Sequence, residues 1–278
     1  MTSATSSTST ETAPKGGRLN GGATRAAVGK VGYGLFGALL VVVLWFLIAV
    51  TGVVGNGLVP RPDEVAVAMW QRFAHSGLLF DLRVSVTRVL IGVAVGCLIA
   101  LPVGFLLAWY PRIRAVFEPL VNFFRALPPI ALIPLVIVYF GIGELARISI
   151  LVYASFFAAV VVLYEGISSL DPIYVRAARA LGATSWEVFS RCVAPASVPH
   201  LFTALRVALG VSWATLVAAE LIAASRGLGA VIQTAGNFFQ IPDIYVGIIL
   251  IGCCALVMDY LLKVIQARAT KWQERTQR

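Results

Sequence analysis

Residues 86–108 read VTRVLIGVAVGCLIALPVGFLLA, an apolar run that contains a single charged side chain, Arg88. A helix needs about 20 predominantly apolar residues to cross roughly 30 Å of hydrocarbon, and this run is long enough. It also contains a GxxxG pattern from Gly92 to Gly96, whose small residues let the backbone of a neighbouring helix approach closely. The run therefore predicts a membrane-spanning helix that packs tightly against another helix.

Five further runs have the same character. They lie at about residues 34–54, 121–141, 146–166, 201–224 and 244–265. The chain as a whole is 59% hydrophobic and 13% charged, which leaves too few charged side chains to cover a soluble globule of 278 residues. The sequence therefore predicts an all-α fold, that of a polytopic integral membrane protein with about six transmembrane helices.

The formal net charge of +9 is explained by the positive-inside rule for membrane proteins. Six spans place both termini on one side of the membrane. If that side is the cytoplasm, 16 Lys and Arg residues lie inside and 6 lie outside. Both termini and the polar loop at 167–200 are therefore predicted to be cytoplasmic. A protein that reads nucleic acid would concentrate its basic residues on one soluble face, so we expect no nucleic-acid partner.

The composition divides the chain into five parts. Residues 1–30 are rich in Ser, Thr, Gly and Ala and predict a disordered cytoplasmic tail. The segment 31–58 holds the first transmembrane helix, whose apolar run begins too late and is too long for a cleaved signal peptide. An amphipathic periplasmic connection at 59–85 leads into a core of five transmembrane helices at 86–265. A basic cytoplasmic tail follows at 266–278.

Common catalytic and nucleotide-binding motifs are missing from the sequence. It has no GxxxxGK[ST] phosphate loop, no GxSxG elbow and no HExxH helix. The cysteines show no CxxC spacing and the two histidines are far apart: Cys97, Cys192, Cys253, Cys254, His75 and His200. We therefore expect a protein that is not an enzyme and that binds no metal and no cofactor. If ATP drives its activity, the ATPase must be another protein.

The polar loop begins with strong helix-capping signals. Asp171 can cap a helix that has Pro172 at its first position. Gly182 can end this helix in a left-handed turn. The sequence thus predicts a short helix between these residues.

A second short helix is predicted after it. Thr184 and Glu187 match a capping box, and Pro195 is expected to limit the helix. The two helices together could seat in a groove on a partner, or they could lie as an amphipathic loop on the lipid headgroups. The apolar residues that the second helix would present are Trp186, Val188 and Phe189.

This loop resembles the EAA loop of the permease subunits of ABC importers. Four residues stand at the spacing of that motif: Ala177, Ala178, Gly182 and Pro195. Arg176 occupies the position where the family usually has Glu. The resemblance implies that the loop contains a coupling helix, which docks on a separate ATPase. The residues that it assigns to this contact are Arg176, Ala177, Ala178, Leu181, Gly182, Ala183, Trp186 and Pro195.

Three other stretches resemble the nitrate, sulfonate and taurine branch of these permeases: SVTRVLIG at 85–92, NFFRALP at 122–128 and AAELIAASRGLG at 218–229. The resemblance implies an importer of the bacterial inner membrane, in contact with membrane lipid. Its implied partners are a second permease chain in a homodimer, two ABC ATPase subunits that bind ATP and Mg, and a periplasmic or lipid-anchored substrate-binding protein. The implied cargo is a small organic anion similar to a sulfonate, taurine or nitrate.

Charged and proline residues inside the predicted spans are candidates for the translocation pathway. Glu220 lies near the outer end of the fifth span, where it could pair with Arg88 or line an outer vestibule. Pro128 and Pro129 interrupt the third span, which indicates either a packed kink or a wall of the pathway. With one amide and one indole side chain added, the full set of candidates is Asn122, Arg125, Pro128, Pro129, Trp213 and Glu220.

Two other classes of protein stay open from the residues alone. A secondary transporter driven by an ion gradient commonly shows broken helices in both halves of the chain, and the proline-rich break here has no evident counterpart. A membrane scaffold without a transport role would share the composition. The ABC importer permease is the preferred hypothesis, because topology, the missing nucleotide site and the polar loop all favour it.

Overall fold

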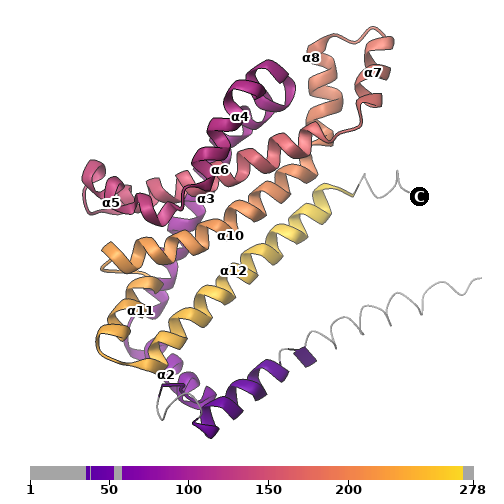
Figure 1. Cartoon of the computed structure of the whole chain (residues 1–278). Helices are drawn as coiled ribbons and strands as arrows, with labels where there is room; N and C mark the ends of the chain where they lie inside the picture. The colour runs from indigo at the N-terminus through magenta and orange to yellow at the C-terminus, as the bar shows by residue number, and fades with distance from the viewer. Residues whose placement is uncertain (1–35, 38, 53–57, 272–278) are drawn as a thin grey trace, which may run out of the picture. The chain divides into compact units, whose positions relative to one another are not determined.

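The computed structural model describes residues 36–37, 39–52 and 58–271, and every regular element in them is a helix (Figure 1). Within these ranges, four helices are long and apolar enough to cross a membrane: α3 (Leu78–Trp109), α6 (Glu144–Ser168), α10 (Val198–Ala223) and α12 (Ile241–Ala269). The prediction of an all-α polytopic membrane protein is therefore confirmed. The predicted tail at 1–30 and the end of the one at 266–278 lie outside the described residues.

The described residues up to Pro62 belong to a compact unit of their own, which contains the apolar helix Leu39–Thr51. In this unit the indole Nε1 of Trp45 donates a hydrogen bond to the carbonyl oxygen of Pro60 (3.1 Å). The predicted first span at 31–58 extends into residues that the structure does not describe. Its length and its membrane-spanning role stay predictions.

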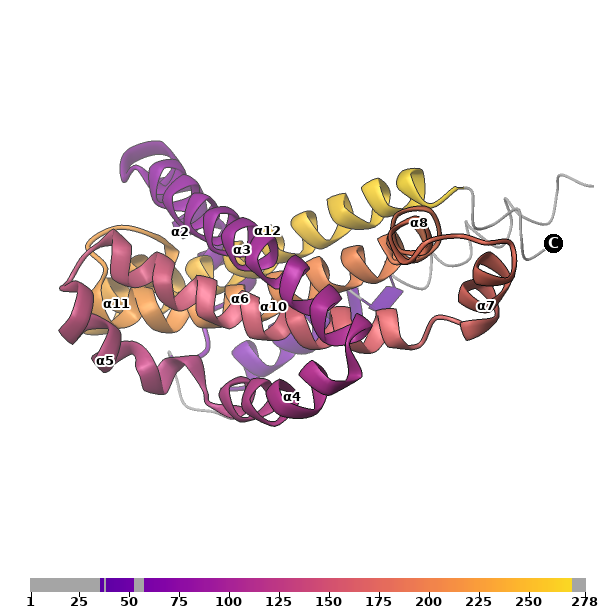
Figure 2. The ribbon, with the colours of Figure 1, turned by 90° about the horizontal axis from the view of Figure 1, so that it is seen from above.

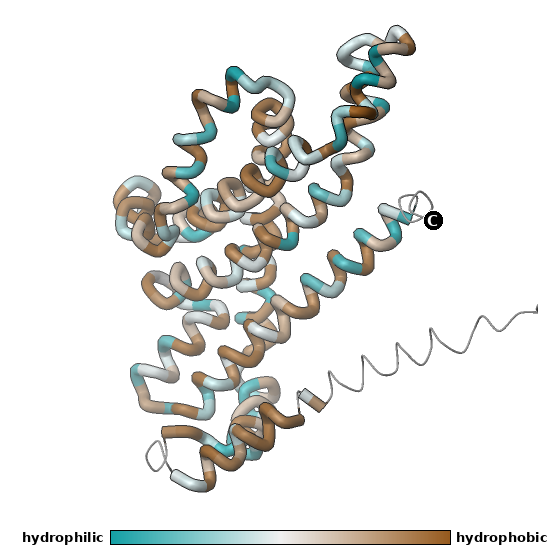
Figure 3. The backbone as a smooth tube through the Cα atoms, turned by 45° about the vertical axis from the view of Figure 1, so that its right-hand side comes forward, coloured by the Kyte–Doolittle hydropathy of each residue, from teal (hydrophilic) through white to brown (hydrophobic). Residues whose placement is uncertain are grey.

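The second unit, from Asp63 onward, is a bundle in which α3, α6 and α10 pack against one another and α12 packs against α10. The short helices α7 (Pro172–Ala180) and α8 (Ser185–Val188) lie at one end of this bundle. Helix α11 (Leu228–Asn237) and α5 (Pro129–Phe140) lie toward the other end (Figure 2). Helix α12 is hydrophobic over most of its length and turns hydrophilic toward its C-terminal end (Figure 3).

Helices α3 and α6 approach closely because glycines of α3 face α6. A Cβ added at Gly92 would lie 2.5 Å from the Cβ of Leu151. At Gly96 it would overlap the hydroxyl of Ser155, which donates a hydrogen bond to the carbonyl oxygen of Gly92 (2.8 Å). The GxxxG pattern is therefore a helix-packing motif, as predicted.

We expect Gly96→Val to destabilise the protein by about 1–3 kcal/mol, the usual cost of overpacking a core. The new side chain would meet both the Ser155 hydroxyl and the carbonyl oxygen of Val152. The measurement is the midpoint of thermal unfolding of the detergent-solubilised protein. Gly252→Val on α12 is the matched control, because a Cβ there meets no atom within 4 Å. Equal midpoints for the two variants would contradict the close contact between α3 and α6.

The predicted third span at 121–141 is interrupted at Pro128 and Pro129, as expected from its prolines, and its first helix begins earlier, at Pro111. Helix α4 (Pro111–Ala126) and α5 (Pro129–Phe140) meet at an angle of 92°. The two residues between them, Leu127 and Pro128, are extended. The reason is that proline lacks an N–H group and disfavours the helical conformation in the residue before it.

The bent pair still joins the two ends of the bundle. The pair begins after Trp109, at the end of the bundle where the short helix α8 lies. There the ring of Trp109 contacts the ring of Phe189, the residue that follows α8, with a distance of 5.8 Å between the ring centroids. The pair ends at Phe140, shortly before α6 starts at Glu144 at the opposite end. Counted as one broken span, the pair brings the candidate membrane spans among the described residues to five.

Other boundaries differ from the prediction as well. Helix α3 begins at Leu78 rather than at 86, so the connection predicted at 59–85 contains α2 (Pro62–His75) and the first turns of α3. Helix α11, with 10 residues, is an addition to the predicted elements. It is too short and too near the fifth span to stand out as a separate apolar run.

Candidate functional site

The two-helix knob, residues 171–189, is built by the predicted capping residues. The carboxylate of Asp171 accepts a hydrogen bond from a backbone N–H in the first turn of α7 (2.8 Å). Gly182 follows α7 with a φ of +85°, in the left-handed region that glycine favours. Glu187 accepts a hydrogen bond from the N–H of Thr184 (2.9 Å) and donates its own N–H to the Thr184 hydroxyl (3.3 Å). The backbone N–H of Thr184 and then its hydroxyl lower the pKa of the Glu187 carboxyl, which is therefore ionised at neutral pH.

The outer surface of the knob is apolar at two positions. The side chains of Leu181 and Trp186 are 89% and 72% exposed. Most residues that the resemblance assigned to the ATPase contact share this surface: Arg176, Ala177, Leu181, Gly182 and Trp186 are exposed, and Ala178 and Ala183 are half-buried. The knob projects at one end of the bundle (Figure 1), and Leu181 and Trp186 are its most exposed large apolar side chains.

Two apolar side chains of the knob face inward instead. Val188 is fully buried, and the ring of Phe189 packs edge-on against Phe105 (5.3 Å between centroids) and Trp109 (5.8 Å) on α3. The prediction that Val188 and Phe189 present an apolar docking surface is therefore wrong. Phe189 anchors the knob to the end of α3.

Pro195 does not end the second helix of the knob, which corrects another prediction. The chain continues through a π-helical turn, η1 (Phe189–Val193), and α9 (Ala194–Ala196) almost directly into α10. Pro195 lies in α9, directly after the π-helical turn. It is exposed, but it belongs to the segment that joins the knob to α10.

An ion-pair network, buried except at Glu144, closes the end of the bundle opposite the knob. At its centre, Arg88 donates from Nη1 to Oε1 of Glu220 (2.7 Å) and from Nε to Oε2 of Glu144 (2.7 Å). Arg88 is 3% exposed and Glu220 is 1% exposed. Glu144 also accepts a hydrogen bond from Nη1 of Arg147 (2.6 Å). The predicted pairing of Glu220 with Arg88 is therefore confirmed, and Glu220 has no open surface in this conformation. The network comprises Asp81, Ser85, Arg88, Glu144, Arg147 and Glu220.

The same network fixes the loop between α10 and α11. The N–H of Gly229 donates to Oε2 of Glu220 (2.8 Å). The hydroxyl of Ser85 accepts the N–H of Leu228 (2.9 Å) and donates to the Glu220 carboxylate (2.8 Å). Gly227 has a φ of +122°, and a Cβ there would overlap that carboxylate. Only glycine fits this position, so loop and ion pair form one unit.

A cleft of about 220 Å³ lies where the corner between α4 and α5 meets α6 and α10. Among the predicted pathway residues, Arg125 and Pro129 line it. Their neighbours from the same corner are Phe124 and Leu127. We call this space the corner cleft; its other walls are Tyr153, Ala154, Phe157, Ala158, Val161 and Val162 of α6, and Val207 and Val211 of α10.

The remaining pathway candidates lie elsewhere. Asn122 is half-buried and Pro128 is exposed, and neither lines the cleft. Trp213 is 3% exposed in the core, and Glu220 belongs to the ion-pair network. The aromatic side chains of Tyr153 and Phe157, which line the cleft, were not predicted as pathway residues. The only feature of the sequence that could have indicated them is their position in the middle of an apolar run.

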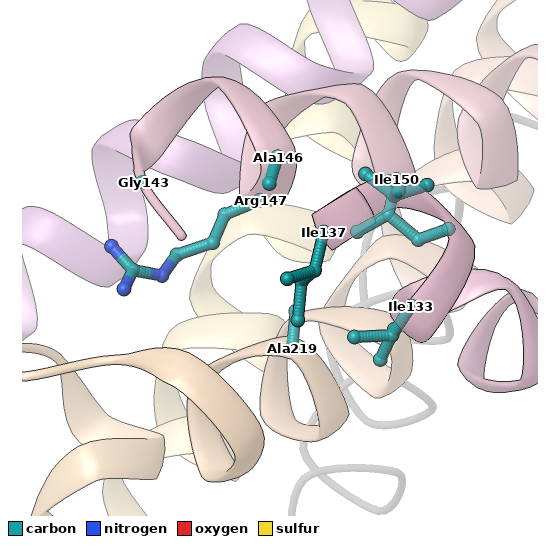
Figure 4. A pocket seen from close by; sticks show the side chains of 8 residues that line it. Ile133, Ile137, Gly143, Ala146, Arg147, Ile150 and Ala219 are labelled. Atoms are coloured by element: carbon teal, nitrogen blue, oxygen red, sulfur yellow. The ribbon is translucent and has the colours of Figure 1, made fainter. Parts of the chain in front are cut away.

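A smaller apolar pocket, about 10 Å³ in volume, lies between α5, α6 and α10 (Figure 4). Ile133, Ile137 and Ile150 face one another across it, whereas the guanidinium of Arg147 points away from them. Such a volume holds at most about one water molecule, so it is a packing void and not a ligand site. Among the described residues, no cluster of His, Cys, Asp or Glu side chains could hold a metal ion.

Residues 100–272 match the family described as the binding-protein-dependent transport system inner membrane component. The chain belongs to this family. It is a permease subunit of the ABC importer type, so that the knob and the corner cleft are parts of a transport protein.

Similar proteins cover most of this permease. A probable ABC transporter permease protein of Brucella abortus (strain 2308) is 43% identical over 83% of this chain and 91% of its own length. The taurine transport system permease protein TauC of Escherichia coli (strain K12) is 35% identical over 84% of this chain and 87% of its own. A chain in the solved structure of the MetNI methionine ABC transporter, in inward-facing conformations, has the same fold, with a TM-score of 0.62. The two chains are 20% identical, and the match covers 69% of this chain and 96% of that one.

Proposed function

We propose that this permease forms the translocation pathway of an ATP-driven importer for a small organic anion, such as a sulfonate or taurine. Two copies pair in the bacterial inner membrane, with both termini and the knob in the cytoplasm. Two separate ABC ATPase subunits bind ATP and Mg and dock on the knobs. A periplasmic or lipid-anchored binding protein delivers the anion, or a related one such as nitrate, to the opposite end.

The observation that carries the coupling role is the exposed apolar surface of the knob. Leu181 and Trp186 present large apolar side chains to the surroundings, on helices that are held in place by caps and by Phe189 against α3. Exposed apolar groups on a rigid element are typical of the core of a protein interface. A groove on an ATPase subunit that receives them would transmit its movement to α3 and α10.

The choice of substrate class is supported by the relation to TauC, which extends over 84% of this chain. The orientation is supported by the basic residues near the knob, of which Arg176, Arg179 and Arg191 are exposed. The ion-pair network lies at the opposite end, which this orientation places on the periplasmic side.

A tagged permease purified from its own cell membranes should bring down a P-loop ATPase. Proteoliposomes that contain this complex and the binding protein should then take up radiolabelled taurine only when ATP is supplied, and a protonophore should not abolish the uptake. Short alkanesulfonates and nitrate, tested as competitors, define the substrate range. Uptake that persists without ATP and collapses with the protonophore would instead identify a secondary transporter, and the absence of any flux would contradict a transport role.

A further inference from the structure

The corner cleft contains a cation that no other part of the described chain neutralises. Arg125 is exposed and lines the cleft, and within the described residues its guanidinium forms neither an ion pair nor a hydrogen bond. Several charged groups of the long helices are paired instead. The pairs are Arg88 with Glu144 and Glu220, Arg206 and Lys263 with Asp259, and Arg147 with Glu144.

The cleft lies at mid-depth in the bundle. Tyr153 and Phe157 follow the start of α6 by 9 and 13 residues, which is about 14 and 20 Å along a helix about 37 Å long. Val211 occupies a similar middle position on α10. A charged side chain at this depth is costly in hydrocarbon, and such residues typically face a water-filled or ligand-binding space.

The walls around Arg125 are aromatic and apolar. The rings of Phe124 and Phe157 are stacked at a centroid distance of 5.6 Å, and Tyr153 lies 4.8 Å from Phe157. The hydroxyl of Tyr153 donates a hydrogen bond to the carbonyl oxygen of Phe124 (2.6 Å), which ties the end of α4 to α6. The cleft therefore offers one fixed cationic end and one apolar side on elements that are held together.

This chemistry selects a short organic anion. A guanidinium presents paired N–H donors that match the oxygens of a sulfonate or carboxylate, and these charge-assisted bonds are the strong ones. The apolar wall suits a short hydrocarbon chain. At about 220 Å³ the cleft is smaller than the pockets that hold drug-sized ligands.

We propose that the corner cleft is a transient transport site in which Arg125 binds the anionic group of the substrate while Phe124 and Phe157 cover its carbon chain. The proposal rests on the function proposed above, since it names the residue that recognises the anion. Arg125 is a contact residue of this site, and Tyr153 is a positioning residue that holds the corner.

The test uses proteoliposomes of the complete complex with its binding protein. Arg125→Gln should lower the initial rate of ATP-dependent taurine uptake at least about tenfold, because one charge-assisted hydrogen-bonding group is lost. Arg125→Lys keeps the charge without the paired donors and should give an intermediate rate. Arg112→Gln is the matched control, since Arg112 is exposed at the other end of the same helix and does not line the cleft. Its uptake rate should equal that of the wild type.

A second measurement separates binding from folding. The detergent-purified complex without binding protein should bind radiolabelled taurine, ethanesulfonate should compete, and ethylamine should not. Arg125→Gln should lose this binding at an unchanged thermal midpoint. The proposed site would be overturned if Arg125→Gln took up and bound taurine at the wild-type level. It would also be overturned if Arg112→Gln lost as much uptake and binding as Arg125→Gln. A wild-type complex without ATP-dependent uptake would contradict the proposed function itself.

Discussion

Replacing Glu220 by alanine is expected to prevent the permease from accumulating as a folded protein. The carboxylate accepts hydrogen bonds from Arg88, Ser85 and the N–H of Gly229, all of them buried. Removing it leaves a guanidinium without its innermost partner, which costs about 3–5 kcal/mol when one member of a buried pair is lost. Because the same carboxylate also fixes the α10–α11 loop, that loop should open. The measurement is the yield and thermal midpoint of the detergent-solubilised chain.

Asp259→Ala is the matched control for this prediction. Asp259 pairs with Arg206 (2.7 Å) and Lys263 (2.7 Å), but all three side chains are partly exposed near the knob end. Exposed pairs contribute roughly 0–1 kcal/mol, so this variant should keep nearly the wild-type midpoint. Glu220→Gln retains an acceptor for the N–H of Gly229 and should fall between the two. If Glu220→Ala were as stable as Asp259→Ala, the network would not be holding the fold together.

The pairing of Glu220 with Arg88 could be predicted from the sequence because helix length fixes depth. At a rise of about 1.5 Å per residue, both residues fall near the same end of their spans. The other members of the network, such as Glu144 and the N–H of Gly229, could not be predicted. Which face of a helix turns toward its neighbour depends on packing between spans, and uniformly apolar helices carry no amphipathic stripe that would indicate it.

The prolines between α4 and α5 illustrate a similar limit. Pro128 and Pro129 correctly predicted where the third apolar run breaks, because proline removes a helical hydrogen bond. They could not predict a bend of 92°, since the direction after a break depends on the helices against which each half packs. Consequently the corner cleft, with Arg125 beside aromatic residues of α6, was not visible as a site. The capping residues of the knob did predict its two helices, because caps act within one turn of chain.

A loss of transport without a loss of folding is expected from Leu181→Asp. Leu181 follows α7 directly and is 89% exposed, so an aspartate there removes almost no packing from the permease itself. In the proposed complex the same position is buried against an ATPase subunit. Truncating an interface residue of this kind commonly costs 2 kcal/mol or more, and an unpaired carboxylate adds its desolvation. We therefore expect the affinity for the ATPase to fall by roughly 30-fold or more.

The measurement for Leu181→Asp is the retention of the ATPase on the tagged permease, together with ATP-dependent taurine uptake. Val67→Asp on α2 is the matched control, because Val67 is also exposed (56%) and the substitution is the same, away from the knob. It should retain the ATPase at the wild-type level. Both variants should unfold near the wild-type midpoint, since neither side chain is part of the core. Retained ATPase and normal uptake in Leu181→Asp would rule out the knob as the coupling element, because an acidic side chain cannot be buried there without loss of affinity.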